Sequence, residues 1–430
     1  MRMSRPTYPP PGRLSPRRAA VVAAAFAVAV LLAGCGSGGQ GGPPTGGALT
    51  IYSSLPREGV SARQADAVGA GERLALADAH GHAGGHRVRL VELNSAAPGG
   101  DMWDPDAVEA NARRAAMDPT AVAYLGELDL GGSAVSVPVT SGAGLLQVSP
   151  GDGLTALTRV DPDQPDLSPD GYYHGKGRNF VRLVPPDAVQ AQTLVAWARE
   201  AGARSIAIVR DDRLFGRELA TEAAGAAARL HLPVSVVLEG RRNAADYADV
   251  AGDLAAKPAS ALLYTGLGGP SGQRLLAASV NALPSASVYA TSGLATSLPE
   301  AGAPATSVDV LQPAAVASQY GRRARRVLAR LSAARGAPVP VEALYGYEAM
   351  RLTLDAVDGA RGHAGDRAAV TRAALSPRTR HSVLGDYRVL ANGDPAPAHF
   401  GSYRLAGARL EFLGLRGPAG ALAGAGRNGP

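Results

Sequence analysis

The sequence of 430 residues has a single cysteine, Cys35, and few aromatic or lysine side chains. One cysteine excludes an internal disulfide framework and any zinc site built from several thiolates. Aromatic residues make up 5% of the chain, whereas glycine (54) and proline (32) are abundant, so small side chains and tight turns dominate. Lysine occurs only at Lys176 and Lys257, which leaves arginine as 41 of the 43 basic residues. With 46% hydrophobic and 19% charged residues the chain can bury a core, and its length corresponds to two or three domains.

Motifs of catalysis are also missing. No G-x-S-x-G elbow occurs, and 171–177 has one residue too few between its glycines for a P-loop. The G-x-G-x-x-G match at 424–429 lies in the C-terminal tail, where no helix follows it. His80, His82 and His86 allow either a metal site or a solvated turn, and the glycines among them favour the turn. We therefore expect no enzymatic activity, no cofactor and no metal.

The N-terminal 35 residues indicate export. Five arginines and no acid precede the apolar run Ala19–Ala33, whose 15 residues are too few to span a bilayer comfortably but suit a secretory signal. The run ends in Leu-Ala-Gly-Cys, which resembles a bacterial lipobox, so we expect lipidation at Cys35. The alternative is a plain secretion signal with an incidental cysteine. We predict a signal peptide over 1–34, a Gly-rich tether over 35–47, and a location on the outer face of the cytoplasmic membrane; the choice between general and twin-arginine export stays open.

The basic charge belongs mainly to this signal. Removing residues 1–34 takes away five positive and no negative charges, so the formal net charge falls from +6 to +1. The arginines of 322–326 have the spacing of a solvated helix face rather than a nucleic-acid site. We therefore expect no nucleic-acid partner.

Short β-branched or leucine-rich runs alternate with alanine-rich helical stretches along the mature chain. This alternation predicts an α/β fold with parallel sheets flanked by helices. The Pro- and Asp-rich stretch 161–177 is loop-like and separates two such series. In an arrangement of two α/β lobes, ligand-binding residues follow the carboxyl ends of the strands. The predicted strands are 49–53, 88–93, 122–126, 145–148, 205–209, 234–238, 261–264 and 287–290.

Several segments resemble the extracytoplasmic substrate-binding proteins of ABC importers, in the branched-chain amino-acid (Leu/Ile/Val-binding) branch. The resemblance runs through most of residues 49–400, in the family's order, and its most specific parts are Asn111-Ala-Arg113, Tyr124-Leu-Gly-Glu127 and Val148-Ser-Pro150. The similar segments are 51–59, 103–127, 133–150, 179–212 and 344–357.

The resemblance implies a type 1 periplasmic-binding-protein fold, that is, two doubly wound Rossmann-like lobes joined by a three-strand hinge. It implies lobe one over 48–184 plus about 312–382, lobe two over 185–311 plus about 383–415, and a flexible tail over 416–430. It further implies a small-molecule ligand captured by hinge closure, an ABC permease in the membrane as partner, and a monomer. A sensory or regulatory lipoprotein with the same fold is the alternative function. A secreted hydrolase would need a reactive serine or a metal site that the sequence does not show.

In this family an amino acid is held as a zwitterion, with its carboxylate at a Ser hydroxyl and the start of a helix in lobe one and its ammonium at an acid of lobe two. Carried over to this chain, the ligand-binding positions depart from that pattern: the carboxylate-binding Ser falls on Leu130, a hydroxyl position on Gly153, the lobe-two acid on Ser292 and one aromatic on Gly268. Ser133 at the helix start, the backbone of Gly151 and the aromatic Phe215 remain, and the first similar segment contributes Ser54 and Leu55.

These departures lead to the hypothesis that the ligand is not an ordinary branched-chain amino acid, because an unpaired buried charge costs about 3–5 kcal/mol. Asp129, Asp152 or Glu127 could supply an acid from lobe one, which would suit a cationic or polyol-like ligand. The alternative is an alignment slip of a few residues in the Gly-rich loops.

Overall fold

The structure is a computed structural model, and it describes residues 47–59, 61–97, 103–128, 130–160, 168–175, 177–296, 307–406 and 409–418. The predicted signal peptide, Cys35, all but the last residue of the predicted tether, Asp129 and the end of the chain lie outside these residues. No helix of the described part is long and apolar enough to cross a membrane.

The first sheet has six strands in the order β2-β3-β1-β4-β5-β6, all parallel except β2. The central strand β1 reads LTIYSSL and is buried at every position, because helices cover both faces of the sheet. The strands are β1 (Leu49–Leu55), β2 (His82–Ala83), β3 (His86–Asn94), β4 (Ala121–Leu125), β5 (Leu146–Ser149) and β6 (Phe180–Arg182). The histidine-rich segment thus forms the β2–β3 hairpin.

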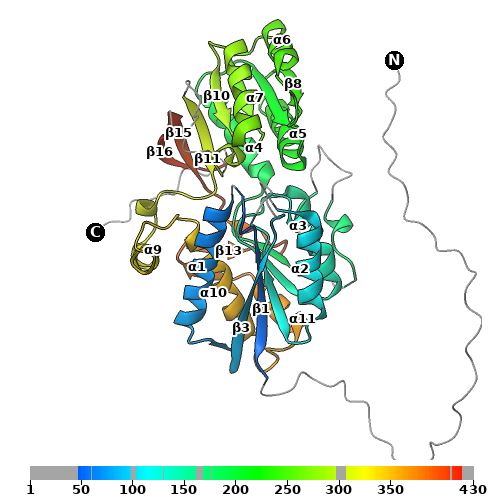
Figure 1. The fold of residues 1–430 in the computed structure, drawn as a ribbon, viewed down its shortest axis with the longest axis vertical. Helices are drawn as coiled ribbons and strands as arrows, with labels where there is room; N and C mark the ends of the chain where they lie inside the picture. The colour runs from blue at the N-terminus through cyan, green and yellow to red at the C-terminus, as the bar shows by residue number, and fades with distance from the viewer. Residues whose placement is uncertain are drawn as a thin grey trace, which may run out of the picture. The chain divides into compact units, whose positions relative to one another are not determined.

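One face of this sheet carries α1 and α10, and the other carries α2 and α3 (Figure 1). Helix α11 belongs to the same apolar cluster as α1 and α10. Helices α1 and α10 lie side by side, and their backbones are in close contact. Glycine at 71 and 346 allows this contact: a Cβ at either position would lie 2.0 Å from a carbonyl oxygen of the facing helix. Helix α9 packs its apolar side on the same pair, with Ala324 buried and its arginines exposed, as the sequence predicts. The helices are α1 (Ala62–Asp78), α2 (Pro105–Met117), α3 (Ser133–Gly142), α9 (Arg322–Arg335), α10 (Ala343–Gly359) and α11 (Arg367–Ala374).

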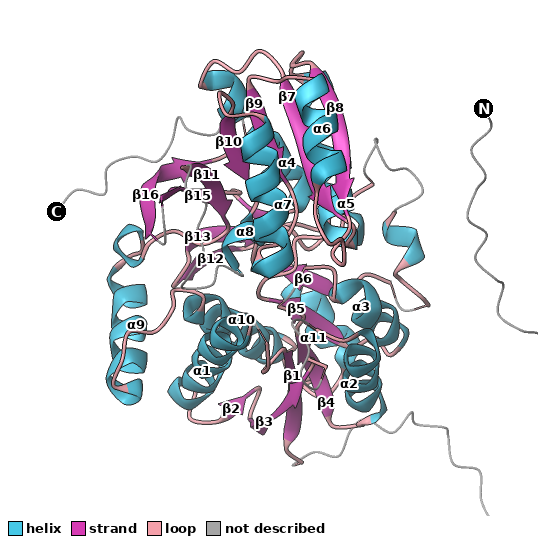
Figure 2. Ribbon diagram, turned by 45° about the horizontal axis from the view of Figure 1, so that its top comes forward, coloured by secondary structure: helices cyan, strands magenta, loops and turns pink. Residues whose placement is uncertain are grey.

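The second sheet has seven strands in the order β16-β15-β11-β10-β9-β7-β8, of which β15 and β16 are antiparallel additions to a parallel core. Helices α4 and α5 cover one face and α6 and α7 the other (Figure 2). The strands are β7 (Ile206–Asp211), β8 (Val234–Gly240), β9 (Ala261–Tyr264), β10 (Ser287–Ala290), β11 (Val308–Gln312), β15 (Phe400–Ala406) and β16 (Arg409–Arg416). The helices are α4 (Asp187–Glu200), α5 (Leu214–Arg229), α6 (Ala248–Ala256), α7 (Gly269–Ala282) and α8 (Ser292–Thr296).

The described chain passes between the two sheets at three places: after β6, after β11 and before β15. A cavity of about 430 Å³ lies beside these crossings and is lined by Pro185, Pro313, Pro397 and His399, among others. The crossings are therefore not tightly packed on that side, which leaves room for the backbone to move.

The third crossing lies later in the chain than the sequence predicts. Residues 383–397, expected in the second lobe, form part of the small sheet of β12 (Thr379–Ser382), β13 (Gly385–Val389) and β14 (Pro395–Ala396). Tyr387 and Val389 belong to the apolar cluster of the first sheet, so burial of these two side chains holds the segment there. Three short 3₁₀ helices, η1 (Thr155–Leu157), η2 (Pro169–Gly171) and η3 (Ala317–Gln319), complete the structure.

The predicted α/β fold of two doubly wound lobes is confirmed. Each of the eight predicted strands overlaps an observed one, from β1 to β10. The short strands β2 and β6 and the strands β11 to β16 are not among the predicted ones.

A buried ion pair connects the end of β6 to the turn before β14. Arg182 Nε donates to Asp394 Oδ1 at 2.9 Å, and both side chains are fully buried. Burial by itself raises the pKa of Asp394, but the guanidinium groups of Arg182 and Arg159 outweigh it and hold that pKa below its usual value.

We expect Asp394→Ala to lower the free energy of unfolding by about 3–5 kcal/mol, because it leaves the Arg182 charge buried without its partner. Urea unfolding followed by circular dichroism measures the change. The matched control is Asp309→Ala, which removes the partner of Arg404, a pair with a half-exposed arginine on the second sheet. That variant should lose about 1 kcal/mol or less, and equal losses in the two variants would contradict the prediction.

Candidate ligand-binding site

The sequence-predicted site residues of the first sheet gather at one edge. Strands β1, β4 and β5 are parallel neighbours, so their carboxyl ends meet there. Ser54 and Leu55 end β1, and the remaining predicted residues follow β4 or β5: Leu130, Ser133, Gly151 and Gly153. The order of strands thus brings together residues that lie up to about a hundred positions apart.

At the end of β1 a buried carboxylate uses the hydroxyl of Ser54. Glu127, 1% exposed, accepts from Ser54 Oγ at 3.1 Å and from Tyr124 Oη at 2.6 Å. Ser54 Oγ in turn accepts from Asn111 Nδ2 at 3.1 Å. Burial, together with the adjacent Glu127 charge, raises the pKa of Tyr124 well above its usual value. Ser54 therefore serves the protein's own polar network.

A second buried carboxylate lies at the start of helix α3. Asp152, fully buried, accepts from the backbone N–H of Ser133 at 2.8 Å, of Leu154 at 3.0 Å and of Gly131 at 3.2 Å. Its own N–H donates to Ser149 Oγ at 2.8 Å, and that hydroxyl donates to the carbonyl of Glu127 at 2.6 Å. The protein thus places a negative charge of its own at the N-terminus of α3, where a helix favours an anion.

The two glycines of the β5 loop lie close to neighbouring atoms. A Cβ on Gly151 would stand 2.4 Å from the carbonyl oxygen of Leu128, and one on Gly153 would stand 2.3 Å from Asp187 Oδ1. Both distances are shorter than real Cβ contacts. Glycine is required at 151, where the neighbour is backbone, whereas the hydroxyl side chain that the family resemblance implies at Gly153 would have to displace the Asp187 carboxyl.

Asp187 begins α4, directly after the first crossing, and contacts the same loop. Its N–H donates to the carbonyl of Gly153 at 2.7 Å, and the N–H of Ala188 donates to Thr155 Oγ1 at 2.8 Å. Burial raises the pKa of Asp187 to about 7, the charge of Asp152 adds to this increase, and Arg182 opposes it. The carboxyl groups of Asp152 and Asp187 therefore lie close enough to influence each other in the loop after β5.

The three predicted residues of the second sheet also lie at its carboxyl edge, after β7, β9 and β10. The N–H of Ser292 donates to Gln190 Oε1 at 2.7 Å, and the N–H of Gly268 donates to the carbonyl of Gly293 at 3.1 Å. Phe215 is buried in an apolar cluster with α4 and α5, and Leu130 of the first lobe packs against this cluster. The predicted residues of both lobes thus lie where the lobes touch, and their role in binding remains a prediction.

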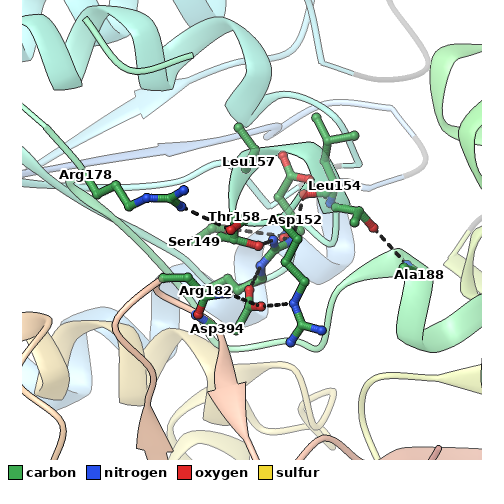
Figure 3. A network of polar contacts seen from close by, with 12 residues as sticks. Ser149, Asp152, Leu154, Leu157, Thr158, Arg178, Arg182, Ala188 and Asp394 are labelled. Carbon is green, nitrogen blue, oxygen red and sulfur yellow. Dashed lines mark hydrogen bonds and ion pairs between the residues drawn. The ribbon is translucent and has the colours of Figure 1, made fainter. Parts of the chain in front are cut away.

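The network around Arg182 positions the β5 loop (Figure 3). Arg182 Nη1 donates to the carbonyl of Leu154 at 2.9 Å and to that of Asp152 at 3.4 Å, and Nη2 contacts Thr158 Oγ1. The guanidinium thus contacts three residues of one loop. Because Arg182 ends β6, these contacts fix the position of Asp152 relative to that strand.

Sequence reasoning named Asp152 and Glu127 only as possible sources of acid, and missed Asp187 and Gln190. Asp187 follows a Pro-Pro pair that predicts a helix start, but no local signal shows that its carboxyl is buried against another loop. Tyr172, in the loop after η2, was missed as well. Burial raises its pKa to about 12, and the charges of Glu218 and Asp152 add to this, so acids of both lobes lie near it.

Among the described residues, no group of three or more His, Cys, Asp or Glu side chains could hold a metal ion.

The buried Asp187 carboxyl should make stability depend on pH. With a folded pKa of about 7 against 3.8 in the unfolded chain, the folded state keeps a proton that the unfolded state has lost. Stability therefore falls as the pH rises from about 4 through 7, with a slope on the order of 1 kcal/mol per pH unit. Asp187→Asn should reduce the slope in urea titrations between pH 4 and pH 8 by about this amount. Burial also raises the pKa of Glu72 to about 8, so that carboxyl keeps a slope of its own in both proteins. Asp253→Asn, at an exposed position of α6, should leave the native slope unchanged; a slope in Asp187→Asn equal to the native one would refute the assignment.

Known structures share this fold. A leucine-binding protein of Thermotoga maritima superposes with a TM-score of 0.70 at 16% identity, over 86% of this chain and 99% of that one. A solute-binding protein of an R. palustris ABC transporter, in complex with benzoate, gives 0.68 at 17% identity over 86% and 97%. The branched-chain amino-acid transporter substrate-binding protein LivJ of Streptococcus pneumoniae, in complex with isoleucine, gives 0.66 at 12% identity over 85% and 99%.

A comparison with curated protein sequences finds no match. The family model described as "periplasmic binding protein" matches residues 50–397, which include both sheets up to the third crossing. The chain therefore belongs to the family of periplasmic binding proteins and has their type 1 fold.

Proposed function

We propose that this chain is a lipid-anchored solute-binding protein of an ABC importer, which captures a small polar ligand between its two lobes and delivers it to a membrane permease. The observation that carries the proposal is the meeting of strand ends from both sheets at one junction. There the loops after β4 and β5 touch α4 and the cluster around α5. A ligand bound at such a junction contacts both lobes, so its binding energy favours the closed arrangement.

The three crossings support the hinge motion that this function needs. Each crossing is a short segment between a strand or helix of one lobe and an element of the other. Proline residues limit the backbone hydrogen bonds that movement would break, and the cavity beside the crossings leaves space for it. The family consists of solute-binding proteins rather than enzymes, which agrees with the lack of a catalytic motif.

Ligand capture can be tested by native mass spectrometry of the exported chain. The expected result is a small-molecule mass that leaves after partial unfolding, and a radius of gyration in X-ray scattering that decreases when the ligand is added back. A chain that carries no small molecule and does not contract with any metabolite fraction would contradict solute capture. A ligand that binds, but whose uptake by cells is unchanged when the protein is deleted, would instead support the sensory alternative.

The proposed location of the protein rests on its N-terminal sequence. Members of the family act outside the cytoplasm, and the lipobox at Cys35 with its Gly-rich tether suits a receptor held at the membrane surface.

Cys35→Ser should abolish lipidation, because a thiol is needed for the thioether bond to the lipid. The variant should move from the detergent phase to the aqueous phase in detergent partition, and from the membrane to the soluble fraction of cells. Ser37→Ala, two residues further on, should remain with the membrane. Membrane association of Cys35→Ser equal to that of Ser37→Ala would rule out the anchor.

A further inference from the structure

The N-terminus of α3 has its backbone donors occupied by the protein itself. The first N–H groups of a helix have no partner within the helix and, with the helix dipole, attract an anion. The N–H groups of Ser133, the first residue of α3, and of Gly131, just before it, donate to the Asp152 carboxylate. Those of Ala134, Val135 and Ser136 donate to the carbonyls of Gly131 and Gly132. Little donor capacity is left for a ligand at this helix.

Asp152 is fixed in this position by contacts on every side. Its carboxylate also accepts from the N–H of Leu154, its N–H donates to Ser149 Oγ, and its carbonyl accepts from Arg182. The side chain is fully buried, so the carboxylate cannot turn to solvent without opening the loop. It is a fixed part of the loop after β5 rather than a mobile group.

The surroundings of Asp152 add negative charge. Burial raises the pKa of Tyr172, and the charges of Glu218 and Asp152 both add to this increase, so two acids lie near that side chain. A ligand carboxylate placed here would meet like charge in a buried region, and that repulsion weakens binding. An amine or a hydroxyl group would meet no such repulsion.

We propose that Asp152 determines the ligand class of this site: its carboxylate fills the anion position of lobe one, so the ligand presents an amine or an uncharged hydroxyl group there, and not a carboxylate. The proposal rests on the proposed function, because it specifies the ligand of the same site. Proteins of the same fold bind leucine, isoleucine and benzoate, and each of these ligands carries a carboxylate. On this proposal the ligand of the present chain differs from them in lacking that carboxylate.

The occupied anion position can be tested without knowing the ligand. Asp152→Ala should lower the melting temperature, and sodium formate should restore much of the loss, because formate fits the space of the missing carboxylate and accepts from the same three N–H groups. Sodium chloride at equal ionic strength should restore less, and formate should leave the native protein unchanged. Asp366→Ala removes an exposed helix cap that accepts from the N–H groups of Ala368 and Ala369, and it should not be rescued by formate.

A panel of matched ligands then tests the class. Leucine, isoleucine and benzoate are compared with isopentylamine, leucinol and benzylamine by titration calorimetry on the native protein and on Asp152→Ala. We expect the native protein to favour the compounds without a carboxylate by about tenfold or more, and Asp152→Ala to gain affinity for the acids.

The outcomes separate the two proposals. Micromolar binding of a carboxylate to the native protein, or the same response to formate in Asp152→Ala and Asp366→Ala, would overturn the role of Asp152 while leaving solute capture intact. If no compound of either kind binds, solute capture loses support, and the formate result alone decides whether Asp152 fills an anion position.

Discussion

The buried pair of Arg182 and Asp394 is the interaction on which the geometry of the binding region depends. Two charges are removed from water, and their attraction compensates for this only when the remaining polar groups also have partners. Arg182 meets that condition by binding the carbonyls of Asp152 and Leu154 and the hydroxyl of Thr158. The same contacts hold the β5 loop against β6, so the electrostatic requirement of one buried guanidinium sets the shape of the candidate site.

This pair also joins two of the three connections between the lobes. Arg182 ends β6, directly before the first crossing, and Asp394 lies just before β14 and the third crossing. Because each partner belongs to lobe one, the pair anchors the lobe-one ends of both crossings without joining the two lobes to each other. A hinge needs such fixed ends, because motion is then confined to the few residues between them.

The polar groups at the junction are largely satisfied within the protein. Ser54 donates a hydrogen bond to Glu127, Asp152 accepts from the first N–H group of α3, and Gln190 accepts from the N–H of Ser292. Buried polar groups without partners are costly, so a binding protein that is stable without its ligand must provide partners of its own. The junction therefore keeps its polar groups paired without a ligand.

The sequence by itself determined the α/β class and most of the parallel strands, because these depend on local composition and on the period of apolar residues; the export signal stays a prediction from the same kind of pattern. The family resemblance added the two-lobed fold and the positions of the candidate site, including the departures at Leu130, Gly153 and Ser292. Only the tertiary structure decided which lobe holds residues 383–397, since Tyr387 and Val389 are drawn to the core of the first sheet. It also decided that Asp152 binds α3 and that Asp187 lies buried beside Gly153. These outcomes depend on contacts between distant segments, such as Arg182 and Asp394, which lie 212 residues apart. No local sequence pattern predicts which donor will bind which carboxylate at such a separation along the chain.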